Sequence, residues 1–326
     1  MNTPRKDPAS LDVIIPIYNE EDVLGSLFEA LEKTFSPAAL KARGIGRVRY
    51  LFVDDGSGDS SASLIAEKIR LGWPATLYRL SRNFGHQNAV SAGLRASRGD
   101  AVAVIDADLQ DPPGTVLAMV DLWRQGYDVV FGERKKRKEG VGKIFCYWLY
   151  YRLLSFLSTV KVPLDSGDFS LMDRRVVEEV SKLPERLRFP RGLRSWVGFR
   201  QIGLAYERDQ RRAGRSKYSL DKLYHLATDG IASLSIKPLK IAQFFTVVYL
   251  LVSFGLTLLS LEKYLLRQSD PIALWFFATY AMISLGNFMT LFCLYVLSAY
   301  VGRTYLEVQG RPSYIVMEVV GDDGSS

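Results

Sequence analysis

The chain has 326 residues, with 42 Lys and Arg against 35 Asp and Glu and a formal net charge of +7 at pH 7. Its two cysteines and two histidines exclude a disulfide framework and a zinc site built from Cys and His. The residues after position 240 are strongly apolar. The basic excess therefore lies before them, where it favours phosphates, nucleic acid or an anionic membrane surface as partners.

Residues 11–135 alternate between short apolar runs and stretches with helical spacing. The predicted strands are residues 11–17, 48–53, 76–80, 101–105 and 129–131, and the predicted helices are residues 20–35, 61–71, 89–98 and 114–124. The alternation predicts an α/β fold, a mostly parallel sheet with helices on both faces. No G-x-G-x-x-G follows the first strand and no P-loop motif occurs, which argues against a dinucleotide dehydrogenase or a P-loop ATPase. No apolar signal-peptide core precedes this region, so we expect it in the cytoplasm.

Polar clusters follow three of the predicted strands, at Tyr18-Asn19-Glu20, Asp54-Asp55 and Asp106-Ala107-Asp108. The carboxyl ends of parallel strands share one edge of a sheet, and ligands of such sheets bind there. Asp106 and Asp108, with a carbonyl oxygen from Gln110, suit a divalent cation, Mg²⁺ or Mn²⁺. The alternative is a solvated loop whose Asp caps the helix that begins near Gly114.

A basic loop, residues 132–140, follows the last of these strands, and Arg134 is its residue nearest the sheet. This placement suits phosphate binding, and a solvated basic loop is the alternative. Residues 143–160 are apolar and aromatic, which fits a helix in a membrane interface or a buried core helix. Residues 164–170 predict a turn before a helix at 174–183. Either the acids of this turn cap that helix, or Asp165 faces the site as a candidate catalytic residue.

Residues 186–217 combine many Lys and Arg with interleaved aromatic residues. This mixture suits either nucleic acid or a phosphate-rich ligand at a membrane surface, and the segments that follow favour the second reading. Residues 219–235 predict an amphipathic helix, which we expect at the membrane interface.

Two uncharged stretches complete the chain, residues 241–261 and a second one within residues 271–302, about 276–301. Each is long enough as a helix to cross a bilayer core of about 30 Å. A buried hairpin of a soluble protein is the alternative. The expected organisation is therefore a catalytic domain at residues 1–218, a juxtamembrane helix at 219–240, a transmembrane hairpin at 241–302 and a cytoplasmic tail at 303–326. Both termini are expected in the cytoplasm.

Taken together, these motifs resemble the family 2 glycosyltransferases with a GT-A fold, a Rossmann-like sheet. The closer resemblance is to the polyprenyl-phosphate glycosyltransferases, the group of dolichyl-phosphate mannose synthase and the bactoprenol glucosyltransferases. The stretches that carry it are residues 13–21, 53–57, 81–85 and 106–113 and the loop through Ser216-Lys217, and the two spans extend it over nearly the whole chain. The Q-x-x-R-W motif of processive synthases is broken at Arg194-Ser195-Trp196, which argues against a processive enzyme.

The resemblance implies a role for each matching residue. It implies a nucleotide pocket lined by Pro16, Tyr18, Glu20 and Asp55, a Mg²⁺ or Mn²⁺ ion held by Asp106, Asp108 and Gln110 beside the Ala107 backbone, a phosphate contact from Arg134, and a loop closed over the donor by Arg211 and Lys217. The implied partners are a nucleotide sugar, a polyprenyl phosphate and the lipid bilayer, without nucleic acid and with a homo-oligomer left open.

The implied reaction is a single displacement that inverts the anomeric centre and gives a β-linked lipid phosphosugar for cell-envelope glycosylation. UDP-glucose and undecaprenyl phosphate are the expected substrates, with GDP-mannose or a UDP-N-acetylhexosamine as rival donors. A membrane-anchored protein that only binds anions through its basic surface is the non-enzyme alternative.

Overall fold

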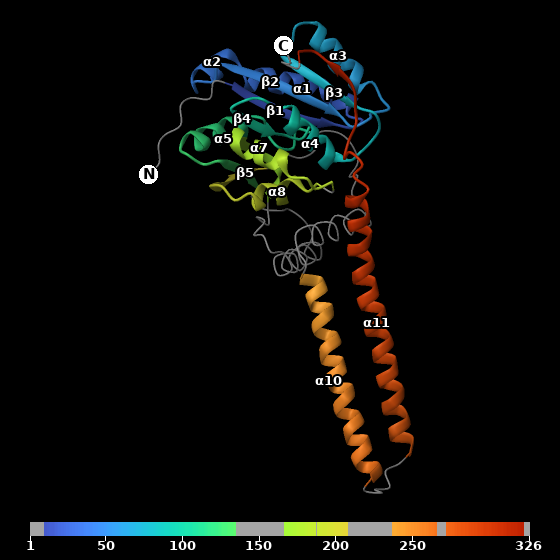
Figure 1. Cartoon of the computed structure of the whole chain (residues 1–326). Helices are drawn as coiled ribbons and strands as arrows, with labels where there is room; N and C mark the ends of the chain where they lie inside the picture. The colour runs from blue at the N-terminus through green and yellow to red at the C-terminus, as the bar shows by residue number, and fades with distance from the viewer. Residues whose placement is uncertain (1–9, 135–165, 187, 208–236, 266–271, 323–326) are drawn as a thin grey trace.

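The computed structural model describes residues 10–134, 166–186, 188–207, 237–265 and 272–322. In Figure 1 an α/β body lies at one end and a long helical hairpin extends away from it. The strands are β1 (Ser10–Ile17), β2 (Arg47–Asp54), β3 (Ala75–Leu80), β4 (Ala101–Val104), β5 (Val129–Arg134), β6 (Ser166–Asp173), β7 (Gln201–Tyr206) and β8 (Val316–Val320). The helices are α1 (Glu21–Thr34), α2 (Pro37–Lys41), α3 (Ser61–Arg70), α4 (His86–Ala96), α5 (Gly114–Arg124), α7 (Arg174–Lys182), α8 (Pro190–Trp196), α10 (Lys237–Leu265) and α11 (Ile272–Val308).

The described strands form one sheet in the order β7-β5-β6-β4-β1-β2-β3-β8. The pairs β1–β2, β1–β4, β2–β3 and β5–β7 are parallel, whereas β6 and β8 pair antiparallel with their neighbours. Apolar side chains cover both faces of the central strands. On β1, for example, Val13 and Ile15 pack in the layer of α1, α3 and α5, whereas Ile14 packs in the layer of α4, α7 and α8. The expected α/β fold, with a mostly parallel sheet and helices on both faces, is confirmed.

Three strands differ from the sequence-based expectation. The turn predicted for residues 164–170 is wrong from Ser166 onward, because β6 begins there and lies between β4 and β5. Its Ser-Gly-Asp start is typical of a turn, but Phe169 and Leu171 then alternate into the core. The sequence did not predict β7 or β8, and β8 adds an antiparallel strand to β3 from within the segment expected to be a tail.

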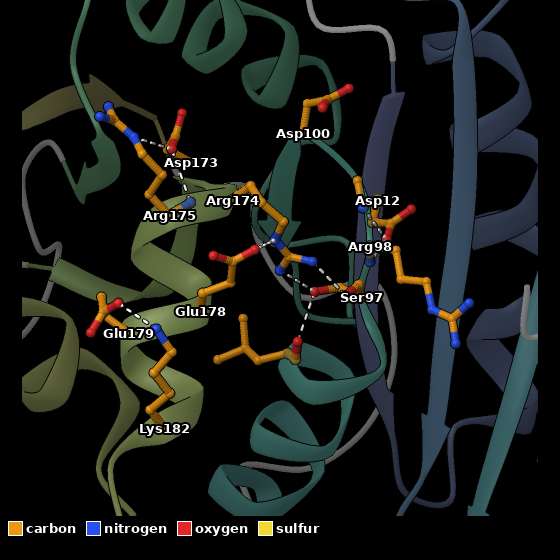
Figure 2. A network of polar contacts seen from close by, with 12 residues as sticks. Asp12, Ser97, Arg98, Asp100, Asp173, Arg174, Arg175, Glu178, Glu179 and Lys182 are labelled. Carbon is orange, nitrogen blue, oxygen red and sulfur yellow. Dashed lines mark hydrogen bonds and ion pairs between the residues drawn. The ribbon is translucent and has the colours of Figure 1, made fainter. Parts of the chain in front are cut away.

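Hydrogen bonds tie the start of α7 to the segment that leads into β4, at the edge of the sheet where β1 and β4 begin (Figure 2). Arg174 donates to the carbonyl and hydroxyl oxygens of Ser97 at 2.5 and 3.0 Å. Asp12 accepts the backbone N–H groups of Arg98 and Gly99 at 2.7 and 2.9 Å and forms a buried ion pair with Arg49 at 2.9 Å. These contacts hold the strands in register at the opposite edge from the polar clusters.

The hairpin consists of α10 and α11, which contain candidate membrane spans at Leu239–Leu256 and Thr279–Val308. The two helices touch where the Tyr249 hydroxyl donates to the Met282 carbonyl at 3.1 Å. Only 6% of each span is buried, so the hairpin is not part of the buried core of the described structure. The interfacial helices expected at residues 143–160 and 219–235 lie outside the described residues.

Candidate functional site

The structure brings the three polar clusters together at one edge of the sheet. Ile17, the last residue of β1, pairs with Asp54 at the end of β2, and Ile14 pairs with Val104 at the end of β4. The chain leaves all three strands at that edge, since these strands are parallel. Asp55 and Asp106 therefore follow neighbouring strand ends.

The cluster after β1 is fixed to the loop after β2. Asn19 adopts a positive φ of 53° and accepts the N–H of Gly58 through its side-chain oxygen at 2.8 Å. Glu20 donates its backbone N–H to the Ser61 hydroxyl at 3.0 Å. Tyr18 is 40% exposed beside these contacts, whereas Pro16 is buried within β1. Tyr18 and Glu20 therefore lie at the edge, and Pro16 contributes to its shape from inside the sheet.

Asp55 organises the loop that leads into α4. Its two carboxylate oxygens accept the backbone N–H groups of Phe84 and Gly85 at 2.7 and 2.9 Å. Burial raises the pKa of Asp55, an effect that these two hydrogen bonds oppose. Gly56 has a φ of 72°, and a Cβ there would lie 2.5 Å from the backbone of Arg82. Residues 81–85 therefore fold tightly over the end of β2.

The segment after β4 holds Asp106 and Asp108 in a tight turn. Leu109 has a positive φ of 57°, and Asp108 accepts the backbone N–H of Gln110 at 3.1 Å. Ala107 is buried, and Asp106 keeps 33% of its side chain exposed. The alternative in which an Asp caps the next helix is wrong, because Pro113 occupies the N-cap of α5 without a side-chain cap.

Asp111, also in this segment, is held by Tyr206 of β7, the last strand at one end of the sheet. It is 1% exposed and accepts a short hydrogen bond from the hydroxyl of Tyr206, in β7. The Tyr206 ring packs edge-on against Phe169, with ring centroids 5.2 Å apart. The turn that carries the two acids is therefore anchored to β7.

Two residues that the sequence did not single out complete the acidic edge, His86 and Asp168. The Nε2 atom of His86, the first residue of α4, lies 3.8 Å from Asp106 and 3.5 Å from Asp168. Asp168 also accepts the side-chain N–H of Gln87 at 3.0 Å. The sequence signal that could have identified His86 is its position just after a loop at a strand end. Asp168 gave no such signal, since it lay within the predicted turn.

Two arginines of α8 lie behind Asp168. Arg191 places its Nε atom 3.6 Å from the Asp168 carboxylate. Arg194 is only 2% exposed, and its guanidinium lies 5.4 Å from the centre of the Phe131 ring. Arg188 is buried as well, at 7% exposure. Part of the basic segment predicted at residues 186–217 is therefore buried inside the protein.

These contacts set the charges at the edge. Burial raises the pKa of Asp106 to about 6, with His86 opposing the shift and the neighbouring carboxylates reinforcing it. Burial lowers the pKa of His86, but contact with Asp168 and the charge of Asp106 outweigh it and raise that pKa to about 9. Burial would raise the pKa of Asp168, yet Arg191 and His86 hold it well below its usual range. Burial lowers the pKa of Arg194 to about 10, a shift that Asp168 opposes. Near neutral pH the edge carries His86 as a cation and Asp168 as an anion.

The residues at the end of β4 fit a hard divalent cation. Asp106 and Asp108 offer carboxylate oxygens and Gln110 a carbonyl oxygen, the donor type that Mg²⁺ and Mn²⁺ prefer. Burial first, and then the neighbouring carboxylates, raise the pKa of Asp106, and a bound cation would oppose both effects. Among the described residues, no three Asp, Glu, His or Cys side chains already form a ligand set. Two carboxylates completed by substrate phosphate oxygens would suffice.

The remaining predicted site residues lie beyond what the structure describes. Asp165, Arg211 and Lys217 are outside the described residues. The backbone of Arg134 ends β5 and pairs with Tyr206 of β7. Arg134 is therefore the last residue of a strand that ends at the acidic edge, and its role stays a prediction.

Comparison with known proteins identifies the family. Residues 12–181 match the family described as glycosyl transferase family 2. The chain is 38% identical to the uncharacterized glycosyltransferase YkcC of Bacillus subtilis (strain 168) over 95% of this chain and 94% of that protein. It is 33% identical to an SfII prophage-derived bactoprenol glucosyl transferase of Shigella flexneri, over 94% of this chain and 97% of that one. A solved mannosyltransferase of Pyrobaculum calidifontis, in complex with GDP-Man and Mn²⁺, aligns with a TM-score of 0.46 and 17% identity over 94% of this chain and 89% of its own. The chain belongs to glycosyl transferase family 2.

Proposed function

We propose that this glycosyltransferase transfers glucose from UDP-glucose to undecaprenyl phosphate at the cytoplasmic membrane face. The product would be a β-linked lipid phosphosugar for cell-envelope glycosylation. The observation that carries the proposal is the connection of the acidic strand-end edge to a membrane-length hairpin, because a short link joins α11 to β8 of the same sheet. Similarity to the Shigella flexneri protein named bactoprenol glucosyl transferase supports glucose as the sugar and a polyprenyl lipid as the acceptor.

The pairing of β8 with β3 supports the proposed topology. Because the chain re-enters the catalytic sheet after α11, both ends of the hairpin would lie on the same side of the membrane as the catalytic domain. We place that side in the cytoplasm. The catalytic domain would comprise residues 1–218 together with β8, and the hairpin residues 241–302 would cross the membrane.

The donor would bind along the acidic edge. Asp106, Asp108 and Gln110 would hold a divalent cation on the diphosphate, with the Ala107 backbone alongside. When bound, this ion would act as a Lewis acid toward the leaving diphosphate. The nucleotide would lie against Tyr18 and Glu20, over a pocket shaped by Pro16 and Asp55, and contacts from Arg134, Arg211 and Lys217 would follow the family pattern.

The charges at the edge suit a phosphate acceptor. A lipid phosphate is already ionised near neutral pH, since its second pKa is about 6, and needs no strong base to attack the anomeric carbon. Asp168 is a poor proton acceptor because its pKa is well below the usual range. Its proposed task is to hold His86 in place as a cation near the phosphates. Positioning and charge would then supply most of the catalysis.

A transfer assay tests the proposal. The purified full chain in neutral detergent receives radiolabelled UDP-glucose, undecaprenyl phosphate and Mg²⁺ or Mn²⁺, and organic extraction measures lipid-linked label. Undecaprenol without phosphate is the acceptor control and a chelator is the metal control. We expect label only with the phosphorylated lipid and the metal. Absence of lipid-linked label with every donor and both metals would refute the proposal.

GDP-mannose and UDP-N-acetylhexosamines are the rival donors in the same assay. The residues at the strand ends would contact the diphosphate of the donor more directly than its sugar. The choice of glucose is therefore supported by similarity to the Shigella flexneri protein. Faster transfer from one of these donors than from UDP-glucose would show that glucose is not the preferred sugar. The proposal of a lipid-phosphate acceptor would still hold.

A further inference from the structure

A polar cavity of about 320 Å³ lies at the joint between the helical hairpin and the catalytic domain. The last turn of α4, the segment that follows α7, and the link between α11 and β8 together form its walls. Figure 1 shows the end of α11 arriving beside the α/β body at this point. The cavity is separate from the acidic edge. Arg95 lines it in the last turn of α4, whereas His86 begins the same helix roughly 15 Å away.

Three arginines line this cavity against one glutamate. Arg95 is exposed, and no hydrogen bond or ion pair ties it to a described residue. Arg186 donates through Nη1 to the Arg311 carbonyl at 2.9 Å. Arg188 is buried and donates to the carbonyl groups that end α7, including Leu183 at 2.6 Å. Burial, and then the charge of Arg95, lower the pKa of Arg188. The cavity therefore carries an excess of positive charge that an anion would relieve.

The carboxylate of Glu185 limits which kind of anion the cavity would bind. The Oε2 atom of Glu185 is buried and accepts no hydrogen bond within the described part of the chain. A bare anion would leave this acceptor unsatisfied, which costs free energy in a buried place. A phosphate ester that carries free hydroxyl groups would satisfy both charges, with its phosphate on the arginines and a hydroxyl donated to Glu185.

The cavity also lies at the level of lipid headgroups if the hairpin spans a membrane. The candidate span Thr279–Val308 has 30 residues, and as a helix it measures about 45 Å, the thickness of a bilayer with its headgroup layers. Glu307, in the last turn of this span, accepts the backbone N–H of Arg186 at 3.0 Å. The arginine-lined cavity thus begins where α11 leaves the headgroup layer.

We propose that this cavity binds the phosphate of an anionic phospholipid with a hydroxyl-bearing headgroup, such as phosphatidylglycerol. Bound there, the lipid fixes the catalytic domain against the membrane surface at its joint with α11. The inference rests on the membrane location given under the proposed function, but not on the sugar donor or the acceptor.

Isothermal titration calorimetry on the full chain in neutral detergent tests the site. The probes are short-chain phosphatidylglycerol, short-chain phosphatidylcholine and inorganic phosphate. Arg95→Gln removes the exposed cation of the cavity. Arg70→Gln is the matched control, because Arg70 also ends a surface helix, α3, on the other face of the sheet. We expect saturable binding of phosphatidylglycerol by the wild type and by Arg70→Gln. The affinity of Arg95→Gln should be lower by a factor of about ten or more.

Three results would overturn the proposal. Equal affinity of the wild type and Arg95→Gln for phosphatidylglycerol would exclude the cavity as the site. Inorganic phosphate that binds as tightly as phosphatidylglycerol, with the same loss in Arg95→Gln, would make it a free-anion site. An equal loss of affinity for phosphatidylglycerol in Arg70→Gln would show that binding depends on the net charge of the protein and not on this cavity. No sugar donor is present, so these outcomes are independent of the transfer assay.

Discussion

The hydrogen bond between Tyr206 and Asp111 predicts a defined cost for one small substitution. Tyr206→Phe removes a single oxygen and keeps the ring that packs against Phe169. Asp111 is 1% exposed and lies three residues after Asp108, so it loses a buried donor that water replaces only by opening the turn. The substitution therefore tests whether β7 anchors the turn that carries the acids.

The size of the effect follows from the charge of the acceptor. A hydrogen bond to a charged group contributes about 1.5–3 kcal/mol to stability. For a domain of about 150–250 residues, each kcal/mol changes the unfolding midpoint by roughly 2–4 °C, so we expect a decrease of roughly 3–12 °C. We expect kcat to fall as well, because the neighbouring acids are held less firmly.

Thermal unfolding followed by circular dichroism, together with the transfer assay, measures both effects. Tyr50→Phe is the matched control. Tyr50 lies in β2, is 4% exposed and stacks on Trp73, but its hydroxyl forms no hydrogen bond among the described residues. We expect that variant to stay within about 1 kcal/mol of the wild type. Equal unfolding midpoints for Tyr206→Phe and the wild type would refute the anchoring of the turn by β7.

Two further predictions concern packing and buried charge. A Cβ at Gly93 would lie 2.3 Å from the Ile14 side chain where α4 packs on β1, so Gly93→Ala should destabilise by about 1–3 kcal/mol in denaturant unfolding. Gly25→Ala, in open space on α1, should instead stabilise by about 0.5–1 kcal/mol, and the same sign for both variants would contradict this packing. Asp12→Ala removes the buried carboxylate that pairs with Arg49 and accepts two backbone N–H groups, so we expect a loss of about 3–5 kcal/mol by the same measurement. A loss below about 1 kcal/mol would show that this ion pair does not fasten the edge.

The central part of the fold could be predicted because its local signals agree with its tertiary structure. The helix expected at residues 20–35 is α1, Glu21–Thr34, since its apolar spacing and its burial coincide. The strands β6, β7 and β8 lacked this agreement. β6 opens with turn-forming residues, and β8 follows a membrane-length helix, so only its pairing with a strand far earlier in the chain makes it a strand.

The candidate site likewise contains residues whose position could be predicted from the sequence and residues whose position could not. Parallel strands bring their carboxyl ends together, so the convergence of Asp55 and Asp106 at one edge follows from the alternation of elements alone. His86 and Asp168 meet only because β6 inserts beside β4, which no local pattern announces. Arg194 looked like part of a basic surface. Its burial depends on the packing of α8 against Phe131 in β5.

The proposed function depends most on Asp106 and Asp108, the acids after β4 that would hold the donor diphosphate. The decisive measurement is the single-turnover rate of label transfer from UDP-glucose to undecaprenyl phosphate by Asp108→Asn. Asp121→Asn, an exposed carboxylate on α5 that faces Arg43, is the control. We expect Asp108→Asn to unfold at the wild-type midpoint and to transfer at least about a hundredfold more slowly, while Asp121→Asn transfers normally. Transfer by folded Asp108→Asn at the wild-type rate would contradict the assignment of the acidic edge as the donor site.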